Sequence, residues 1–280
     1  MSAAAPSTNP APQHCPNCGS AQIAAYCAAC GQDQRDPIRS FAHWVQEYLG
    51  DSFSFDSRLI RSLLPLLGRP GQLSREFVSG RRARYIPPLR AYLFISVLYF
   101  VLAALAPDYS GAIVADQPDA AGVELRTEIR PDDGPLMRWV AERGQKIEAN
   151  PVAFEKAVAD GLPMTLFLCL PLIAGWLALL TAGRGHWYIE HLVFCLHLHS
   201  AFFLIGILQM AVLNLGVSGI GLSLFNLWFP AYLLLALRRA YALNWSGAAW
   251  RAAALGVFGY LLSGGAVFVG FVLLMMARLP

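Results

Sequence analysis

The chain has 280 residues, of which 56% are hydrophobic and 14% are charged, and its mean hydropathy is +0.46. Soluble domains carry about 25% charged residues, so this composition excludes an ordinary soluble globular protein and places most of the chain in lipid. The formal net charge of +3 conceals an uneven distribution, because Glu190 is the one acidic residue after residue 160.

The chain opens with a polar segment and a cysteine motif. Residues 1–13 are rich in Pro, Ala and Ser and lack the basic and apolar regions of a secretory signal, so they predict a disordered leader. Two C-x2-C pairs follow, each trailed by glycine: Cys15, Cys18, Cys27 and Cys30. Paired knuckles of this kind are typical of a closed tetrahedral Zn²⁺ site, and we predict a structural zinc ribbon over 14–32. Two disulfides or four free thiols are the alternatives, but a cytosolic location would keep the thiols reduced.

The cysteine module contains no Lys or Arg between Cys15 and Cys30. Nucleic-acid binding needs cations that neutralise phosphates, so DNA and RNA are not the expected partners. The module is also too small to fold around an apolar core, and metal binding is expected to supply most of its folding free energy. Docking to a protein partner, or to the membrane part of the same chain, is the expected role.

Residues 37–88 predict amphipathic helices that lie at the membrane interface. Apolar residues recur there at helical spacing in two runs: Ile38, Phe41, Val45, Tyr48 and Leu49, then Leu59, Ile60, Leu63, Leu64 and Leu67. Neither run is long enough to span a bilayer, and apolar stripes flanked by arginine suit the headgroup region. A small soluble helical domain is the alternative.

A cluster of arginines ends this segment, just before and inside the start of the next apolar run: Arg81, Arg82, Arg84 and Arg90. Such a cluster favours anionic lipid headgroups and holds its side of the membrane in the cytoplasm. We therefore predict lipid-headgroup contacts at these four positions.

Five apolar segments predict transmembrane helices, near 89–106, 162–182, 192–213, 220–237 and 252–276. If the spans alternate, the arginines of the short loops share the side of the arginine cluster: Arg184, Arg238, Arg239 and Arg251. The acidic segment 107–161 then forms a long extracytoplasmic loop, and the N-terminus is cytoplasmic. The predicted fold class is an all-α polytopic membrane protein with about five transmembrane helices, in which 162–280 form the main membrane domain behind a small N-terminal zinc ribbon.

The third predicted span carries the densest group of ionisable residues in the membrane part: Glu190, His191, Cys195, His197 and His199. Three interpretations stay open. A pair spaced by four residues can chelate a transition metal. Titratable groups inside a span can form a proton or cation path. Neutral imidazoles can also hydrogen-bond across helices as packing groups, with Asn214, Asn226, Gln209 and Ser200 as expected partners.

Several motifs together resemble a known group of proteins. CPNCGS, YCAACGQ, GRPGQLSREFVSGRRARYIPP and YLFISVLYF follow one another between Cys15 and about Ala104, and YIEHLVFCLHLHSAFF comes later. In these motifs the chain resembles an uncharacterised bacterial family of membrane proteins with a short N-terminal zinc ribbon, catalogued as a domain of unknown function. The resemblance implies a zinc ribbon and a multi-span domain in the bacterial inner membrane, and it implies no known activity.

The motifs of common enzymes are absent from the sequence. It contains no G-x-S-x-G, no phosphate-binding loop of the Walker type and no H-E-x-x-H. A closed four-cysteine site also leaves no open coordination position for catalysis. We therefore expect a non-enzymatic role in docking, sensing or scaffolding. The alternative is a small transporter or membrane enzyme that uses the third span.

Overall fold

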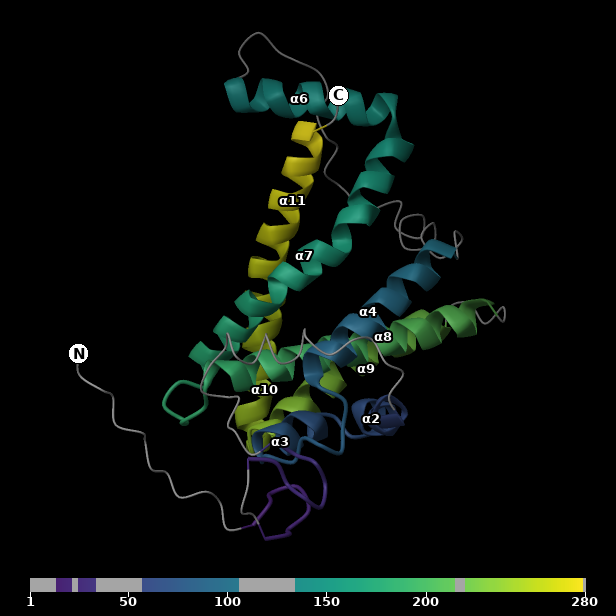
Figure 1. Ribbon diagram of the computed structural model, residues 1–280. Helices are drawn as coiled ribbons and strands as arrows, with labels where there is room; N and C mark the ends of the chain where they lie inside the picture. Colours follow the sequence, from purple (N-terminus) through teal and green to yellow (C-terminus); the bar gives the residue numbers. More distant parts are fainter. Residues whose placement is uncertain (1–13, 22–24, 34–56, 106–133, 215–219, 279–280) are drawn as a thin grey trace, which may run out of the picture.

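The computed structural model describes residues 14–21, 25–33, 57–105, 134–214 and 220–278 (Figure 1). Within these ranges the regular structure is helical, apart from two isolated antiparallel bridges in the cysteine module. The predicted leader and the first predicted amphipathic run, at 38–49, lie outside the described residues.

Two short helices form a collar at one end of the bundle, α2 (Ser57–Gly68) and α3 (Gln72–Val78). Both pack against α8 (Tyr188–Asn214). Their buried apolar side chains include Leu59, Leu66, Leu73 and Phe77. The Tyr232 hydroxyl donates a 2.5 Å hydrogen bond to the Leu66 carbonyl, which satisfies one of the last carbonyls of α2. Part of the predicted apolar stripe is not packed, because Ile60 and Leu64 are 63% and 81% exposed. An interfacial position of α2 therefore stays a prediction.

Four helical stretches in the described part of the chain are long and apolar enough to cross a membrane: Pro88–Leu105, Asp160–Leu180, Tyr188–Asn214 and Trp245–Met275. They correspond to α4 (Pro88–Leu105), to most of α7 (Pro151–Leu180), to α8, and to a continuous run of α10 (Trp245–Ala254), the π-helix η2 (Leu255–Gly264) and α11 (Gly265–Arg278). Helix α9 (Ile220–Ala240) occupies the predicted fourth span. The membrane-protein class is thus supported, with four qualifying helices against the five expected.

Helix α8 is the centre of the bundle. Of its most apolar stretch, 72% is buried, against 33% for α4 and 33% for α7. Of the corresponding stretch in the α10–α11 run, 6% is buried, although η2 and α11 both pack against α7. Helices α4, α7 and α9 pack around α8, and Figure 1 shows α4 and α9 running alongside it. Helix α8 is apolar on all its faces, and a helix of this kind suits the core of a bundle because every face can pack against a neighbour.

The acidic segment before the second span is largely helical from Pro135 onward. Helix α6 (Pro135–Ala149) lies across the top of Figure 1, and α7 begins directly after it at Pro151. Pro135 and Pro151 are the first residues of these helices. Proline is tolerated there because a backbone N–H in the first turn has no hydrogen-bond partner within the helix. The N-terminal part of α7 therefore extends the predicted second span into the segment expected to be a loop.

The short turns of the membrane part meet the collar at one end. Arg239 donates a 2.8 Å hydrogen bond to the Pro70 carbonyl between α2 and α3. Arg251 donates a 2.8 Å hydrogen bond to the Leu180 carbonyl at the end of α7. Arg239 in the last turn of α9 and Arg251 in α10 thus lie on the same side as the collar, as the charge pattern predicts.

Candidate functional site

The four cysteines of the N-terminal module converge on one point. Their ligand atoms all lie within 4.8 Å of one another. The Sγ atoms of Cys15 and Cys30 are 3.7 Å apart, and those of Cys18 and Cys27 are 3.6 Å apart. Zn–S bonds of about 2.3 Å in a tetrahedron place sulfurs roughly 3.8 Å apart. The cysteine geometry therefore fits a four-coordinate metal ion, and the predicted convergence is confirmed.

The two knuckles that hold these sulfurs are built alike. The Gly19 N–H donates to the Cys15 carbonyl, and the Gly31 N–H donates to the Cys27 carbonyl. Each of these hydrogen bonds is 2.8 Å long. Both glycines have positive φ angles, 76° and 72°, which side chains rarely adopt. This repeated turn explains why each C-x2-C pair is followed by glycine.

Two thiols of the cysteine cluster, those of Cys27 and Cys30, have pKa values that are shifted in opposite directions. A hydrogen bond with Ser20, helped by the backbone N–H groups of Cys30 and Ala29, lowers the pKa of Cys27 to about 5. Burial raises the pKa of Cys30 to about 11. A thiolate is the form that binds metal, and a bound divalent cation stabilises all four thiolates together. The cluster is therefore electrostatically suited to a cation.

The cysteine module is fastened to the segment between α3 and α4 by Gln32, which is 5% exposed. Its Nε2 donates a 2.6 Å hydrogen bond to the Gly80 carbonyl. Its Oε1 accepts from the backbone N–H groups of Arg82 at 3.0 Å and Ala83 at 3.2 Å. Pro16, from the first knuckle, lies against Gly80 as well. Both knuckles thus contact the loop that leads into α4, and Figure 1 shows the module beside α3.

The arginines of the predicted headgroup cluster make contacts within the protein. Arg81 forms an ion pair with Glu76, with Nε 2.5 Å from Oε2. The Arg82 guanidinium lies 4.9 Å from the centre of the Phe77 ring, and that of Arg84 lies 5.9 Å from the Tyr85 ring. Arg84 is exposed and Arg90 is half-buried. Lipid binding by this cluster stays a prediction.

The histidines of α8 are buried, and hydrogen bonds join two of them to described residues outside α8. The Thr181 hydroxyl donates to the Leu177 carbonyl, so it is the acceptor for His191 Nε2 at 3.4 Å. Nδ1 of His191 then accepts from the Tyr241 hydroxyl at 2.8 Å, and the two rings stack 5.5 Å apart. His197 Nδ1 shares a 3.0 Å hydrogen bond with the Ser74 hydroxyl on α3.

The other members of this set are held within α8 itself. His199 Nδ1 donates a 2.8 Å hydrogen bond to the Cys195 carbonyl. The Cys195 side chain is fully buried. No group of three metal-ligating side chains forms on α8 within the described residues, where the four N-terminal cysteines are the group that converges. The geometry therefore gives no support to the metal interpretation of this helix.

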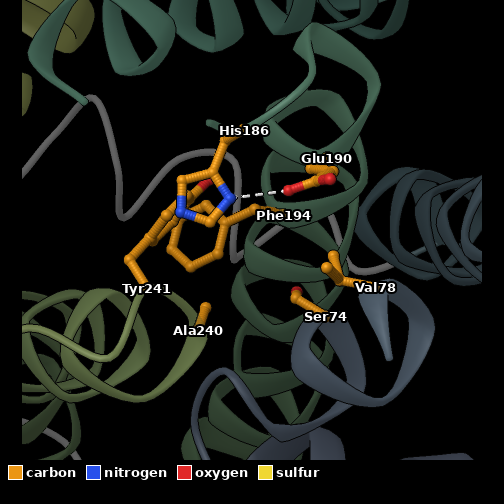
Figure 2. Close-up of a pocket in the computed structure, with 7 residues that line it drawn as sticks. All are labelled: Ser74, Val78, His186, Glu190, Phe194, Ala240 and Tyr241. Carbon is orange, nitrogen blue, oxygen red and sulfur yellow. Dashed lines mark hydrogen bonds and ion pairs between the residues drawn. The ribbon is translucent and has the colours of Figure 1, made fainter. Parts of the chain in front are cut away.

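Glu190 is paired with a residue that the sequence analysis did not single out. His186 Nδ1 lies 2.7 Å from Glu190 Oε2, and Glu190 is 8% exposed. The pair lines a cavity of about 10 Å³, whose wall includes Ser74 of α3 and Tyr241, the residue after α9 (Figure 2). That volume is about the size of one water site. The spacing of four residues between His186 and Glu190 was the signal that could have identified this pair.

The partners expected for the histidines differ from those observed. Ser200 donates to the Leu196 carbonyl of its own helix, and Asn214 is exposed. Gln209 Nε2 has no hydrogen-bond partner among the described residues, and the side chain of Asn226 lies outside them. The actual partners come from the α3 collar and the turns, which no periodicity within α8 could indicate.

Comparison with protein-family models gives a match within the first half of the chain. Residues 56–100 match the model of a family described as a protein of unknown function, DUF3667. The matched stretch runs from the start of α2 through most of α4 and includes the arginine cluster, but not the cysteines. Neither the curated proteins nor the solved structures contain a match to this chain. The match supports the resemblance to an uncharacterised family.

Proposed function

We propose that this chain is a multi-pass protein of the bacterial inner membrane whose cytosolic structural zinc ribbon has a docking, sensing or scaffold role. One observation carries the proposal: four sulfurs surround a single point, and the residue two positions after Cys30 fastens that module to the segment entering α4. The membrane placement is supported by four helices of sufficient length and apolarity.

Zinc is the metal that this donor set favours. Four thiolates in a tetrahedral arrangement suit Zn²⁺, and they leave no coordination position for a substrate. Cys15 and Cys27 are each 2% exposed, whereas Cys18 lies exposed at the surface of the module. The metal's chemistry here is structural: it holds the two knuckles together in a module without an apolar core.

The contacts of Gln32 link the metal to the membrane domain. The Gln32 side chain satisfies one carbonyl and two N–H groups of residues 80–83. When the metal is lost, nothing holds the two knuckles together. The module then unfolds, and the hydrogen bonds of Gln32 to residues 80–83 break. The backbone of residues 80–83 would then be uncovered and accessible to a protein partner. This sequence of events is how the ribbon would sense metal or redox state.

The cytoplasmic orientation is proposed from the distribution of arginine. The collar, the Arg239 region and Arg251 lie at one end of the bundle, with the ribbon beside them. Positive residues in short loops mark the cytoplasmic side. Reporter fusions at the N-terminus and within 107–133 test the orientation, and an external N-terminus would contradict it.

Limited trypsin digestion of the full-length protein in lipid nanodiscs tests the sensing role. We expect cleavage after Arg81, Arg82 and Arg84 to be slow with zinc and at least about tenfold faster after chelation or in Cys27→Ser, because release opens the segment to the protease. Cleavage after the exposed Arg184 is the internal control and should not change. Equal rates at residues 81–84 with and without zinc would contradict the proposal.

Two variants separate docking from folding of the ribbon. Gln32→Ala should retain one zinc per chain but lose the protection of residues 81–84, because the glutamine contacts the loop and not the metal. A pull-down with wild type and Cys27→Ser identifies cytosolic partners, and an unchanged partner set would argue against the docking role.

A second function is favoured by the pair of buried Glu190 and half-buried His186. A carboxylate and an imidazole beside a water-sized cavity can pass a proton, as expected for a small transporter or membrane enzyme. Proteoliposomes with a pH-sensitive dye test this directly. Proton flux that is lost in Glu190→Gln at unchanged melting temperature would support transport. Absent flux together with a lowered melting temperature would assign the pair to packing.

A further inference from the structure

A larger cavity of about 330 Å³ lies among the membrane-spanning helices. It is lined by residues of α7, α8, α9, η2 and α11, and it shares no lining residue with the cavity at Glu190. Its volume falls in the range of roughly 300–1,000 Å³ that is typical of small-molecule sites. The cavity is therefore large enough for part of an organic ligand.

The wall of this cavity is almost entirely apolar. Four phenylalanines contribute to it: Phe202, Phe203, Phe229 and Phe268. Phe268 is 43% exposed and stands on the run of helix that is 6% buried. A ligand would thus enter from the lipid, which selects for a membrane-soluble molecule.

One polar group in the wall has no partner. The Tyr260 hydroxyl is buried, and it has no hydrogen-bond partner among the described residues. The Tyr260 ring is held in place, since it stacks on His199 with ring centroids 5.8 Å apart and meets Phe229 edge-on at 5.8 Å. A buried hydroxyl without a partner is unfavourable in lipid, so this donor points to a ligand.

The backbone around Tyr260 is also unusual. The residue lies in η2, a π-helix of 10 residues within the last span. π-Helical segments are rare, and they occur frequently at functional sites because the widened turn repositions side chains. This geometry sets the phenol beside His199 on the central helix.

His199 adds an acceptor to the same wall. Its Nδ1 donates to the Cys195 carbonyl, which can only accept, so the neutral ring leaves Nε2 as an acceptor. No described residue forms a hydrogen bond with that Nε2. The cavity thus offers one unpartnered donor and one unpartnered acceptor in largely apolar surroundings, since the hydroxyl of Thr165, which also lines it, donates to the Gly161 carbonyl.

We propose that this cavity binds a membrane-soluble alcohol, an apolar molecule with a single hydroxyl group. A hydroxyl both accepts and donates, so it satisfies the Tyr260 hydroxyl and His199 Nε2 together. A carbonyl or an ether oxygen satisfies only Tyr260. The aromatic wall accommodates the apolar body of the ligand.

Photolabelling of the full-length protein in nanodiscs tests this assignment. The probe is a diazirine-bearing long-chain primary alcohol, compared with its methyl ether and with the corresponding alkane. We expect the alcohol to label the segments 160–175 and 255–270 with an apparent Kd about five- to tenfold lower than that of the ether, which lacks one hydrogen bond. Equal labelling by all three probes would overturn the proposal.

Variants locate the site and keep folding separate from binding. Tyr260→Phe removes only a hydroxyl without a described partner, so it should leave the melting temperature unchanged and weaken alcohol binding about fivefold, without affecting the alkane. Cys169→Phe fills the cavity and should abolish labelling by every probe. Tyr188→Phe is the matched control, because its hydroxyl donates to the Pro171 carbonyl away from the cavity. A Tyr260→Phe protein that binds the alcohol like wild type would refute the assignment.

Discussion

Ser74 and His197 lie 123 residues apart in the chain and share a buried hydrogen bond of 3.0 Å. Ser74 is 3% exposed and His197 is 6% exposed. The bond joins the short collar helix α3 to the central helix α8. It gives the imidazole of a membrane helix a partner from outside the spans, so the collar is part of the packed bundle.

Ser74→Ala should lower the free energy of unfolding by about 1–2 kcal/mol, because it leaves the buried His197 ring without its partner. Unfolding in mixed detergent micelles measures this change. Ser79→Ala is the control, since the exposed Ser79 hydroxyl donates only to the Arg75 carbonyl of its own helix, and it should cost less than about 0.5 kcal/mol. Equal stability of the Ser74→Ala protein and wild type would remove the structural role of this bond.

Gly71→Ala should be more damaging than Gly183→Ala. Both glycines have positive φ angles, 76° and 80°, so alanine is strained at either position by roughly 1–2 kcal/mol. A Cβ at Gly71 would also collide with the Ala236 carbonyl oxygen on α9, whereas a Cβ at Gly183 meets no atom within 4 Å. We expect Gly71→Ala to cost about 1–3 kcal/mol more. Thermal unfolding of the two variants side by side checks this difference, and similar melting temperatures would contradict the close approach of α3 and α9.

Glu76→Gln should lower stability at neutral pH but not in acid. A hydrogen bond from Arg81 lowers the pKa of the Glu76 carboxyl below its ordinary value. A carboxyl whose folded-state pKa is depressed adds stability above its unfolded pKa of about 4.3, and this contribution is lost as the pH falls through the folded value. Arg81 is 41% exposed, so the effect at pH 7 should stay below about 1 kcal/mol. Melting temperatures from pH 7 to pH 3 should converge for wild type and variant, and a gap that widens in acid would contradict the sign.

Metal removal should expose four of the six cysteines. Cys169 and Cys195 are buried among the membrane helices, whereas the other four form the N-terminal cluster. With zinc bound, we expect few thiols to react with a water-soluble thiol reagent. With a chelator present, four should react, and all six should react in SDS. Six reactive thiols before SDS would show that the membrane helices do not protect Cys169 and Cys195 as described.

Much of the architecture was predictable because its causes are local. The trailing glycines and the C-x2-C spacing force each knuckle into the same turn, so the convergence of Cys15, Cys18, Cys27 and Cys30 follows from short-range geometry. The long apolar runs likewise predict helices, since lipid leaves no other partner for backbone N–H and C=O groups. The partner of Glu190 was within reach too, because His186 is four residues away.

Other parts of the sites depend on segments that are distant in the chain. Gln32 has no feature of its own that predicts a contact with residues 80–83, because that contact depends on where the ribbon packs. Tyr260, whose hydroxyl has no described partner, lies in a π-helix. The spacing of apolar residues in the sequence does not predict that π-helix.

The sequence by itself determined that the chain has helices apolar enough to cross a membrane and a four-cysteine module, because hydropathy and ligand spacing are local properties of the chain. Only the tertiary structure decided that α8 is the buried centre, that α3 supplies the partner of His197, and that Tyr260 faces an apolar cavity beside His199. The physical reason is that burial and hydrogen-bond satisfaction are properties of contacts between elements. The sequence of a uniformly apolar helix does not indicate which neighbouring helix will pack against each of its faces.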